Sequence, residues 1–211
     1  MSTLLNMLGN LERVPEDQVP SPGSYYPNWG FTIYRTQYGG SSDQKWQALL
    51  DKIQAQLVEE LEEEGGDDDD DAQAREKLSS LFRLDARSDA GLLQHASMDQ
   101  VRQLYQDNQG GSPLNADLPT HRYFLLADAE VLEDAGRGEF WVKCVQPDYV
   151  AADYVPKNAR LGGGQRYFGW MKMTTRSVFD LWRELDTRHL EGIAPQTIGG
   201  MHLVMWDGQF T

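Results

Sequence analysis

A strand of β-branched and aromatic residues that leads directly into an amphipathic, Trp-containing helix constrains the fold of this chain most, and the arrangement occurs twice. The first copy is residues 28–53, NWGFTIYRTQYGGSSDQKWQALLDKI, and the second is residues 167–185, YFGWMKMTTRSVFDLWREL. In both copies the apolar positions change from a period of two to spacings of three and four residues. The sequence therefore predicts two strands, each followed by a helix that packs across a sheet.

The helix of the first copy has the strongest periodicity in the chain, and Ser41 or Ser42 is its expected N-cap. In the second copy, Thr174 or Thr175 is the expected N-cap. The positions expected on the buried stripes are Trp46, Leu49, Leu50, Ile53, Leu57 and Leu61 in the first helix, and Val178, Leu181, Trp182 and Leu185 in the second.

Between the two copies, the sequence predicts a short strand at residues 81–86, a helix that begins after Ser97, and strands at residues 121–128 and 139–148. Ser97 and Gln100 have the spacing of a capping box. Asp128 is the expected cap of a short helix through Val131 and Leu132. Because strands outnumber helices, the predicted fold class is α+β, with a mainly antiparallel sheet and helices packed on one face. The most specific version is a ferredoxin-like arrangement of two related halves, since the strand-to-helix unit is repeated.

Composition divides the chain into an arm and a domain. Residues 1–28 contain the segment VPSPGSYYPN and are expected to form an extended arm. Residues 29–211 are expected to form a single α+β domain that ends in a strand at residues 199–208. Ten of the 33 acidic residues lie between residues 59 and 71, so the segment 62–74 is expected to be a disordered, solvated insertion.

The net charge limits the partners of the protein. A formal charge of −14 would repel the phosphate groups of nucleic acids and of anionic membrane surfaces, so neither is an expected partner. No apolar run approaches the length of a transmembrane helix, and the N-terminal residues lack the pattern of a signal peptide. The single cysteine, Cys144, excludes an intramolecular disulfide. We therefore expect a soluble protein of the cytoplasm.

Residues that commonly bind metals are scattered along the chain. They show neither a pair of histidines four residues apart nor a Cys-x-x-Cys spacing. Cys144 lies within a predicted strand and is expected to be a core thiol. The chain has no phosphate-binding loop and no nucleophile elbow. We therefore expect no metal site and no cofactor. The scattered residues are His95, His121, Cys144, His189 and His202.

Strand alternation gives the main candidate site. Trp141 and Lys143 are expected to face away from the helices, and Trp170 and Lys172 in the late strand are expected to do the same. Two Trp-x-Lys pairs would then share one open face of the sheet. Aromatic walls with a few cationic groups are typical of a pocket for a small, flat, anionic or phenolic ligand.

The first and third strands contribute further candidates to this face. Thr32 and Tyr34 alternate with the core residues of the first strand, and the third strand adds either His121 and Tyr123 or the two residues that alternate with them. A lysine near another cation in a partly apolar site loses proton affinity, which would permit acid–base catalysis without a cofactor. The expected catalytic residues are Lys143, Lys172, His121 and Tyr34, and the expected ligand-binding residues are Trp141, Trp170, Thr32 and Tyr123.

The same alternation has two other interpretations. On any half-solvated sheet, lysine stems cover aromatic rings while the charged ends stay in water. Exposed Trp and Tyr side chains are also frequent anchors of protein interfaces, so the open face could join two copies in a homodimer. The acidic segment could attract a basic partner. The alternative function is therefore that of a non-enzymatic interaction or scaffold protein.

Four segments of the chain resemble a large set of uncharacterised proteins from filamentous fungi, over roughly residues 25–185. They are the strand NWGFTIYRTQY, the Trp helix after it, the helix with VRQLY and the late strand YFGWMKM. The set has no established activity, so the resemblance implies only a fungal, intracellular protein. With the aromatic face, it leads us to expect a protein of secondary metabolism that binds an aromatic or polyketide-like compound. It could act as a cofactor-independent isomerase, cyclase or dehydratase.

Overall fold

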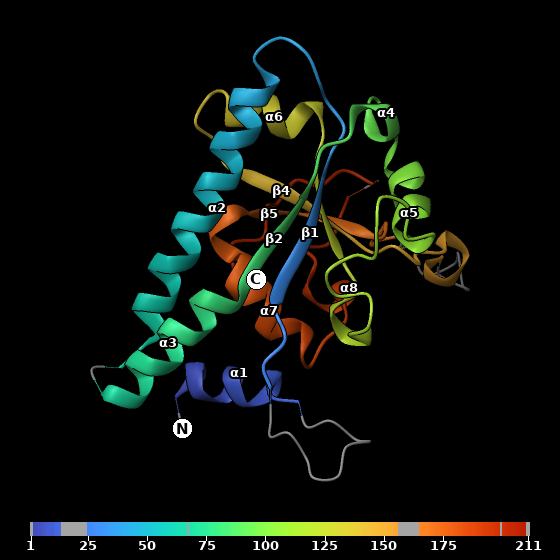
Figure 1. Cartoon of the computed structure of the whole chain (residues 1–211). Helices are drawn as coiled ribbons and strands as arrows, with labels where there is room; N and C mark the ends of the chain where they lie inside the picture. Colours follow the sequence, from blue (N-terminus) through green and yellow to red (C-terminus); the bar gives the residue numbers. More distant parts are fainter. Residues whose placement is uncertain (1, 14–24, 67, 156–164, 199, 210–211) are drawn as a thin grey trace.

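The protein is built around one five-stranded sheet (Figure 1). The computed structural model describes residues 2–13, 25–66, 68–155, 165–198 and 200–209. The strands are β1 (Trp29–Arg35), β2 (Phe82–Arg87), β3 (Phe124–Ala127), β4 (Trp141–Val145) and β5 (Trp170–Thr174). The helices are α1 (Thr3–Leu11), α2 (Ser42–Glu64), α3 (Asp69–Leu81), α4 (Ala90–Leu93), α5 (Met98–Gln106), α6 (Ala129–Ala135), α7 (Val178–Leu185) and α8 (Leu190–Ile193), with short 3-10 turns η1 (Pro119–His121), η2 (Ala151–Tyr154) and η4 (Thr175–Ser177).

The sheet is mixed, which corrects the expectation of a mainly antiparallel sheet. The strand order is β2-β1-β3-β4-β5. β1 pairs in parallel with β2 and with β3, whereas the β3–β4 and β4–β5 pairs are antiparallel. In the split β-α-β unit of a ferredoxin-like fold, another strand separates the two parallel strands. Here β1 and β2 are direct neighbours, so the fold is α+β without that arrangement.

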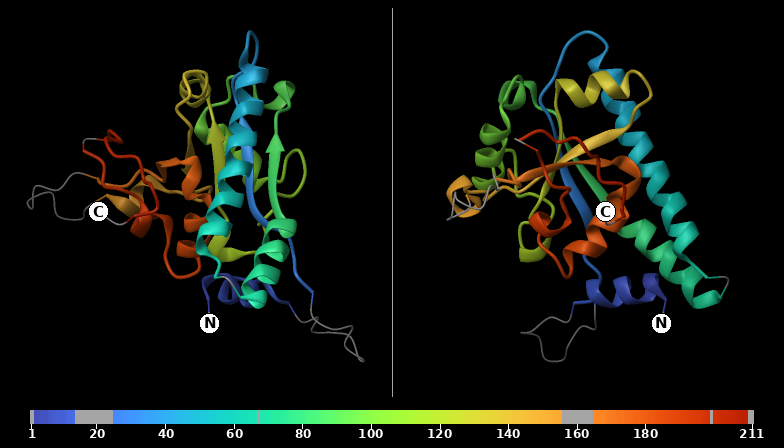
Figure 2. Two further views of the ribbon diagram at one scale, coloured as in Figure 1. Left: turned by 90° about the vertical axis from the view of Figure 1, so that its left-hand side faces the viewer. Right: turned by 180° about the vertical axis from the view of Figure 1, so that it is seen from behind.

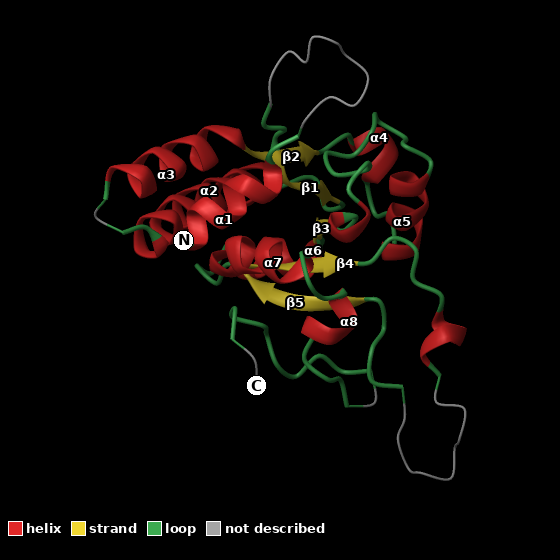
Figure 3. Ribbon diagram, turned by 90° about the horizontal axis from the view of Figure 1, so that it is seen from below, coloured by secondary structure: helices red, strands yellow, loops and turns green. Residues whose placement is uncertain are grey.

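Helices cover both faces of the sheet and not one face as expected. α2 and α7 pack on one face, in a core that includes Phe31 and Leu125. α4 and α5 pack on the other face, against Tyr34 and Phe124. Figure 3 shows the strands between these two groups of helices. The face that was expected to be open is therefore covered along β1 and β3.

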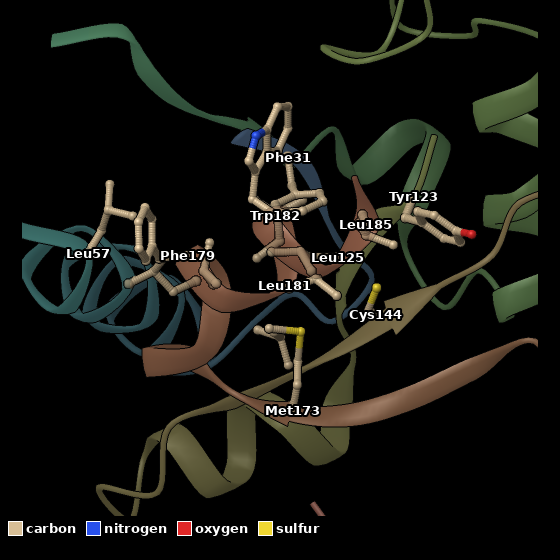
Figure 4. Packing of buried hydrophobic residues seen from close by; sticks show 14 of the residues in the cluster. Phe31, Leu57, Tyr123, Leu125, Cys144, Met173, Phe179, Leu181, Trp182 and Leu185 are labelled. Carbon is tan, nitrogen blue, oxygen red and sulfur yellow. The ribbon is translucent and has the colours of Figure 1, made fainter. Parts of the chain in front are cut away.

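Both strand-to-helix units form at the predicted positions. The residues of the α2 stripe are buried apart from Leu50, which is partly buried, and all four stripe residues of α7 are buried. Trp182 of α7 packs edge-on against Phe31, with ring centroids 5.7 Å apart (Figure 4). Ser41 is the N-cap of α2, whereas α7 follows η4 and has Ser177 as its N-cap. β1 is an interior strand and β5 ends the strand order, so the two units are not equivalent.

Residues 3–11 form α1, which corrects the expectation of an extended arm over this part. Three apolar residues share one face of the helix and pack toward α2 and α3 (Figure 2). Ser2 is the N-cap, and its hydroxyl accepts a hydrogen bond from the helix. The packed residues are Leu4, Met7 and Leu11. Residues 14–24 of the predicted arm lie outside the described residues.

The acidic run is largely helical, which corrects the expectation of a disordered insertion at residues 62–74. α2 extends into the run, and α3 begins within it. Asp68 caps α3 by accepting from the backbone N–H of Asp71 at 2.8 Å. Asp71 accepts from the Ser2 hydroxyl and from the backbone N–H of Gly66, and these bonds lower the pKa of Asp71. Carboxylates are stable here because a helix N-terminus offers unpaired N–H groups and a positive dipole end.

Two predicted caps are confirmed, whereas the last predicted strand is irregular. The side chains of Ser97 and Gln100 form the reciprocal hydrogen bonds of a capping box at the start of α5. Asp128 caps α6. In the described part of residues 199–208, Trp206 pairs with β5 through a single bridge, and no regular strand forms.

Candidate functional site

Trp141, Lys143, Trp170 and Lys172, which we name the Trp–Lys cluster, lie on one face of the β4–β5 pair. The register places Lys143 directly opposite Lys172. Side chains that are directly opposed in an antiparallel pair lie on the same side of the sheet. The ammonium of Lys172 lies 4.5 Å from the centre of the Trp141 ring, and that of Lys143 lies 5.1 Å from the centre of the Trp170 ring. Four of the predicted site residues are thus in mutual contact.

Two carboxylates neutralise both lysines. Asp128 Oδ2 lies 2.6 Å from Lys143 Nζ. Glu130, in the first turn of α6, bridges the two ammonium groups at 3.0 Å from Lys143 and 2.7 Å from Lys172. Burial favours the protonated form of Glu130, but the hydrogen bonds from Lys172 and Lys143 outweigh burial and lower the pKa of Glu130. The four groups form a compensated ion-pair network.

The Trp–Lys cluster is closed on its β4 side. Trp141 is 2% exposed and Lys143 is 7% exposed. Trp141 Nε1 donates to the carboxylate of Asp134 on α6 at 2.8 Å. Lysine catalysis as we expected it requires repulsion between uncompensated cations, and Glu130 removes that repulsion. The cluster is best explained as a structural connection between α6 and the β4–β5 pair.

His202, which the sequence analysis did not include in any site, completes this region. Its ring lies on Trp170 with ring centroids 3.6 Å apart. Burial, reinforced by the charges of Lys172 and Lys143, lowers the pKa of His202 to about 4. Its Nε2 is buried and has no hydrogen-bond partner in the described part of the chain. No periodicity links His202 to Trp170, because it lies in an irregular segment.

Thr32 and Tyr34 lie on the same face of the sheet as the Trp–Lys cluster. This part of the face is covered by α4 and α5. Tyr34 is 1% exposed and packs edge-on against Phe124, with centroids 5.4 Å apart. Burial raises the pKa of Tyr34 to about 12. Thr32 Oγ1 donates to Asp85 and accepts from the backbone N–H of Leu114, both at 2.9 Å. β3 separates both residues from the Trp–Lys cluster, so the structure does not bring them into one site with the lysines.

His121 and Tyr123 lie toward the α7 side of the sheet, which corrects their placement with the Trp–Lys cluster. His121 belongs to η1, and its ring lies on Trp182 with centroids 4.0 Å apart. One ring nitrogen is 3.0 Å from the Trp182 carbonyl oxygen, and the other is 2.9 Å from the Thr120 hydroxyl. Burial lowers the pKa of His121, so the ring is a neutral core group. On β3 it is Phe124 that faces the Trp–Lys side.

A cavity of about 450 Å³, which we name the Tyr123 cavity, opens at the end of the sheet where β3 begins and β4 ends. Segments far apart in the sequence surround it, namely the end of α5, η1, η2, the residues after β4 and the start of α8. Tyr123 is the one predicted site residue that lines it. The lining side chains that matter for binding are Arg122, Tyr123, Asp148, Tyr154, His189 and Glu191.

Tyr123 gives the cavity a neutral hydrogen-bonding group. Its side chain is largely buried, and burial raises its pKa to about 12. The phenol therefore keeps its proton at neutral pH. Its oxygen accepts from the backbone N–H of Leu190 at 3.3 Å, and no described residue accepts its O–H. The hydroxyl can therefore donate to a ligand.

Four exposed ionisable side chains of both signs line the cavity, namely Arg122, Asp148, His189 and Glu191. No ion pair joins any of them to another residue of the described chain. Elsewhere, charged side chains are commonly paired, as in the Trp–Lys cluster. No local pattern predicts this site, because these residues share neither a motif nor a period.

The wall formed by Tyr154 is held in place by Gln146. The Tyr154 hydroxyl lies 3.3 Å from Gln146 Nε2, and the Tyr167 hydroxyl donates to Gln146 Oε1 at 2.9 Å. Arg102 of α5 donates to the backbone carbonyl of Gln146 at 3.0 Å. Side-chain hydrogen bonds therefore hold this one wall of the cavity in place.

Comparison with protein-family models, curated proteins and solved structures gives no significant match to this chain. Among the described residues, no group of three or more His, Cys, Asp or Glu side chains is arranged to hold a metal ion. In that same part of the chain, no helix is both long and apolar enough to cross a membrane.

Proposed function

We propose that the protein binds a small aromatic or anionic molecule in the Tyr123 cavity. The observation that carries this proposal is a cavity of about 450 Å³ lined by four ionisable side chains without ion-pair partners in the described chain. Small-molecule sites typically have volumes of roughly 300–1,000 Å³. Unpaired charges remain available to a ligand, whereas the lysines of the Trp–Lys cluster are already neutralised.

The lining residues suggest how such a ligand would bind. Arg122 would hold a carboxylate or phenolate, because a guanidinium presents several N–H groups in one plane. The rings of Tyr123 and Tyr154 would contact an aromatic ring of the ligand. The Tyr123 hydroxyl would donate to an oxygen of the same molecule. His189 would reinforce the anion site when protonated.

A catalytic version of this proposal is the cofactor-independent isomerisation, cyclisation or dehydration of an aromatic or polyketide-like compound. His189 and Glu191 would transfer the protons, since both line the cavity. Tyr123 would act as a hydrogen-bond donor and not as a base, because its pKa is about 12. A place in fungal secondary metabolism and in the cytoplasm belongs to the same proposal, and rests on the resemblance of the strands around Trp29 and Trp170.

Calorimetric titration with a matched set of phenols tests the binding proposal. The set comprises 4-hydroxybenzoate, neutral phenol and cationic tyramine. We expect the carboxylate to bind best, and Arg122→Gln to weaken its binding about tenfold because a charged hydrogen-bond pair is lost. Lys52→Gln is the control, since it removes one positive charge on α2, outside the cavity. Equal weakening by both variants, or none by Arg122→Gln, would contradict the proposal.

Product analysis by NMR tests the catalytic version. A compound that binds in the first experiment is incubated with the protein and followed for chemical change. We expect His189→Asn and Glu191→Gln to abolish turnover while binding persists, because each substitution replaces a proton-transferring group with a neutral amide. Lack of any chemical change in the ligands that bind would remove the catalytic version and leave a binding protein.

A further inference from the structure

The irregular segment at the C-terminal end exposes an unusual number of apolar side chains. Residues 198–205 contribute half of the large hydrophobic residues that are exposed in the described chain. An exposed apolar patch of this kind commonly marks an interaction surface. The exposed residues are Ile198, Met201, Leu203, Val204 and Met205.

A groove of about 540 Å³ runs between this segment and α8, and we name it the α8 groove. The groove and the Tyr123 cavity lie on either side of α8 and share Glu191 as a lining residue. The apolar lining consists of Ile193, Ala194, Pro195, Val204, Met205 and Trp206.

One wall of the α8 groove is fixed to the sheet. Trp206 donates its backbone N–H to the carbonyl of Lys172 and accepts from the N–H of Thr174, both at 2.9 Å. Its side chain is 2% exposed. Gly208 has φ of 90°, and any side chain there would collide with the carboxylate of Asp180. The groove therefore has a defined wall despite the irregular backbone.

The charge around the α8 groove is negative. Glu191 and Asp207 are its ionisable lining residues, and no described Lys or Arg lines it. Arg166 is the cation at its border, where it donates to Gln196 Oε1 at 3.2 Å. Asp180 lies against Gly208, and burial, aided by the carboxylates of Glu60 and neighbouring acids, raises the pKa of Asp180 to about 6. The whole chain carries a formal charge of −14. A positively charged occupant would therefore be attracted to the groove.

The indole N–H of Trp206 also lacks a hydrogen-bond partner among the described residues. This N–H is buried, although the side chain lines the groove. A buried donor without an acceptor is costly, so native proteins usually satisfy it. A shift of the side chains that cover the Trp206 ring would let a backbone carbonyl of a bound peptide supply the missing acceptor.

We propose that the α8 groove binds an extended peptide segment of another protein, with apolar side chains flanked by Lys or Arg. The apolar side chains would cover Val204 and Met205, the basic side chains would lie near Asp207, and a peptide carbonyl would accept from the Trp206 indole. This proposal of peptide binding does not depend on ligand binding in the Tyr123 cavity. It assigns the interaction role to the α8 groove and not to the face of the sheet.

Titration of the full chain with synthetic peptides tests this proposal. The probe is a short, end-capped peptide that alternates Leu and Lys, and its charge-inverted match alternates Leu and Glu. We expect the Lys peptide to bind at least about tenfold more tightly, with an affinity that falls as salt rises. The indole N–H resonance of Trp206, assigned with Trp206→Phe, should shift on binding.

Substitutions at exposed positions locate the binding. We expect Val204→Ser combined with Met205→Ser to weaken the Lys peptide about tenfold, and Asp207→Asn about threefold. Leu92→Ser and Glu139→Gln are the controls. Leu92 and Val204 are both 46% exposed, and Glu139 is exposed outside the groove. Glu191 lines both the groove and the Tyr123 cavity and is therefore left unchanged. A negative result for peptide binding is then distinct from a negative result for ligand binding in the cavity.

Three results would overturn the proposal. The first is equal binding of the Leu-Glu peptide, and the second is equal weakening by Leu92→Ser. The third is a concentration-dependent dimer in sedimentation experiments that Val204→Ser with Met205→Ser abolishes, because the occupant would then be a second copy of this chain. Binding of the Lys peptide that is sensitive only to the groove variants would support the proposal.

Discussion

The Trp–Lys cluster and the Tyr123 cavity contain the same kinds of side chain in opposite electrostatic states. Each combines two aromatic rings with ionisable groups of both signs. In the cluster, Lys143 and Lys172 are paired with carboxylates and largely shielded from solvent. In the cavity, Arg122 and its neighbours have no ion-pair partner in the described chain. Residue type therefore does not distinguish the paired network from the proposed binding site, whereas charge compensation does.

The largest effect should follow removal of the buried lysine. Lys143→Met leaves Asp128 without its closest cation, and we expect a loss of about 3 kcal/mol of unfolding free energy. Urea unfolding followed by circular dichroism measures it. Lys52→Met is the control, and ligand affinity of the Tyr123 cavity should not change. A variant of normal stability that no longer binds ligand would reverse the roles of the two regions.

The next largest effect is a loss of folding stability as the pH falls. The pKa of His202 is about 4 in the folded protein and about 6.5 when unfolded, so the unfolded chain holds the proton more tightly. Its contribution to stability is complete above about pH 6.5 and is lost as pH falls toward 4. Because water screens a partly exposed group, we expect the loss to be about 1 kcal/mol. The lowered pKa of His121 acts in the same direction.

Unfolding curves at several pH values measure this loss. In His202→Asn the slope of stability against pH between 6.5 and 4 should be smaller than in the natural chain, with the part due to His121 remaining. Phe or Leu at position 202 would confound the test, because either would change packing on Trp170. An unchanged slope in His202→Asn would show that His202 does not titrate as part of the region around the Trp–Lys cluster.

A smaller loss is expected when the more exposed lysine is removed. Lys172→Met leaves Glu130 paired with Lys143, so we expect a loss of about 0.5 kcal/mol. The same unfolding measurement applies. A double-mutant cycle with Glu130→Gln isolates the interaction between the two side chains. A loss as large as that of Lys143→Met would show that the two lysines contribute equally to the free energy of unfolding.

The smallest effect on stability is expected in the cavity. Asp148 is exposed and unpaired in the described chain, so Asp148→Asn should change stability by less than about 0.5 kcal/mol. It should strengthen binding of an anionic ligand about threefold, because a repelling carboxylate is removed. Calorimetric titration with 4-hydroxybenzoate measures the change. Weaker binding would show that the ligand presents a cation to this side of the cavity.

Local periodicity was sufficient for the two strand-to-helix units and for one side of the sheet. The Trp–Lys cluster follows from alternation on β4 and β5, because neighbours on a strand point to opposite faces whatever the tertiary structure. The capping box at Ser97 and the Asp128 cap were equally local. α1 escaped prediction although Leu4, Met7 and Leu11 have helical spacing, because its surroundings suggested an arm.

Features that depend on distant contacts could not be predicted. The parallel pairing of β1 with β2 and β3 depends on how the intervening helices cross the sheet. The covering of the sheet depends on where α4 and α5 pack, and the position of His202 depends on an irregular segment. The Tyr123 cavity joins residues such as Arg122 and His189, which no local pattern connects.

The position of β1 also bears on how the molecule folds. β1 is an interior strand, and its register pairs Thr32 with Phe124, so about 90 residues of chain separate these neighbours and their pairing closes a long loop. The antiparallel strands β3, β4 and β5 are closer in sequence and can associate with less loss of chain entropy. We therefore expect the pairing of β1 with β3 to limit the folding rate, although both strands are buried in the native protein.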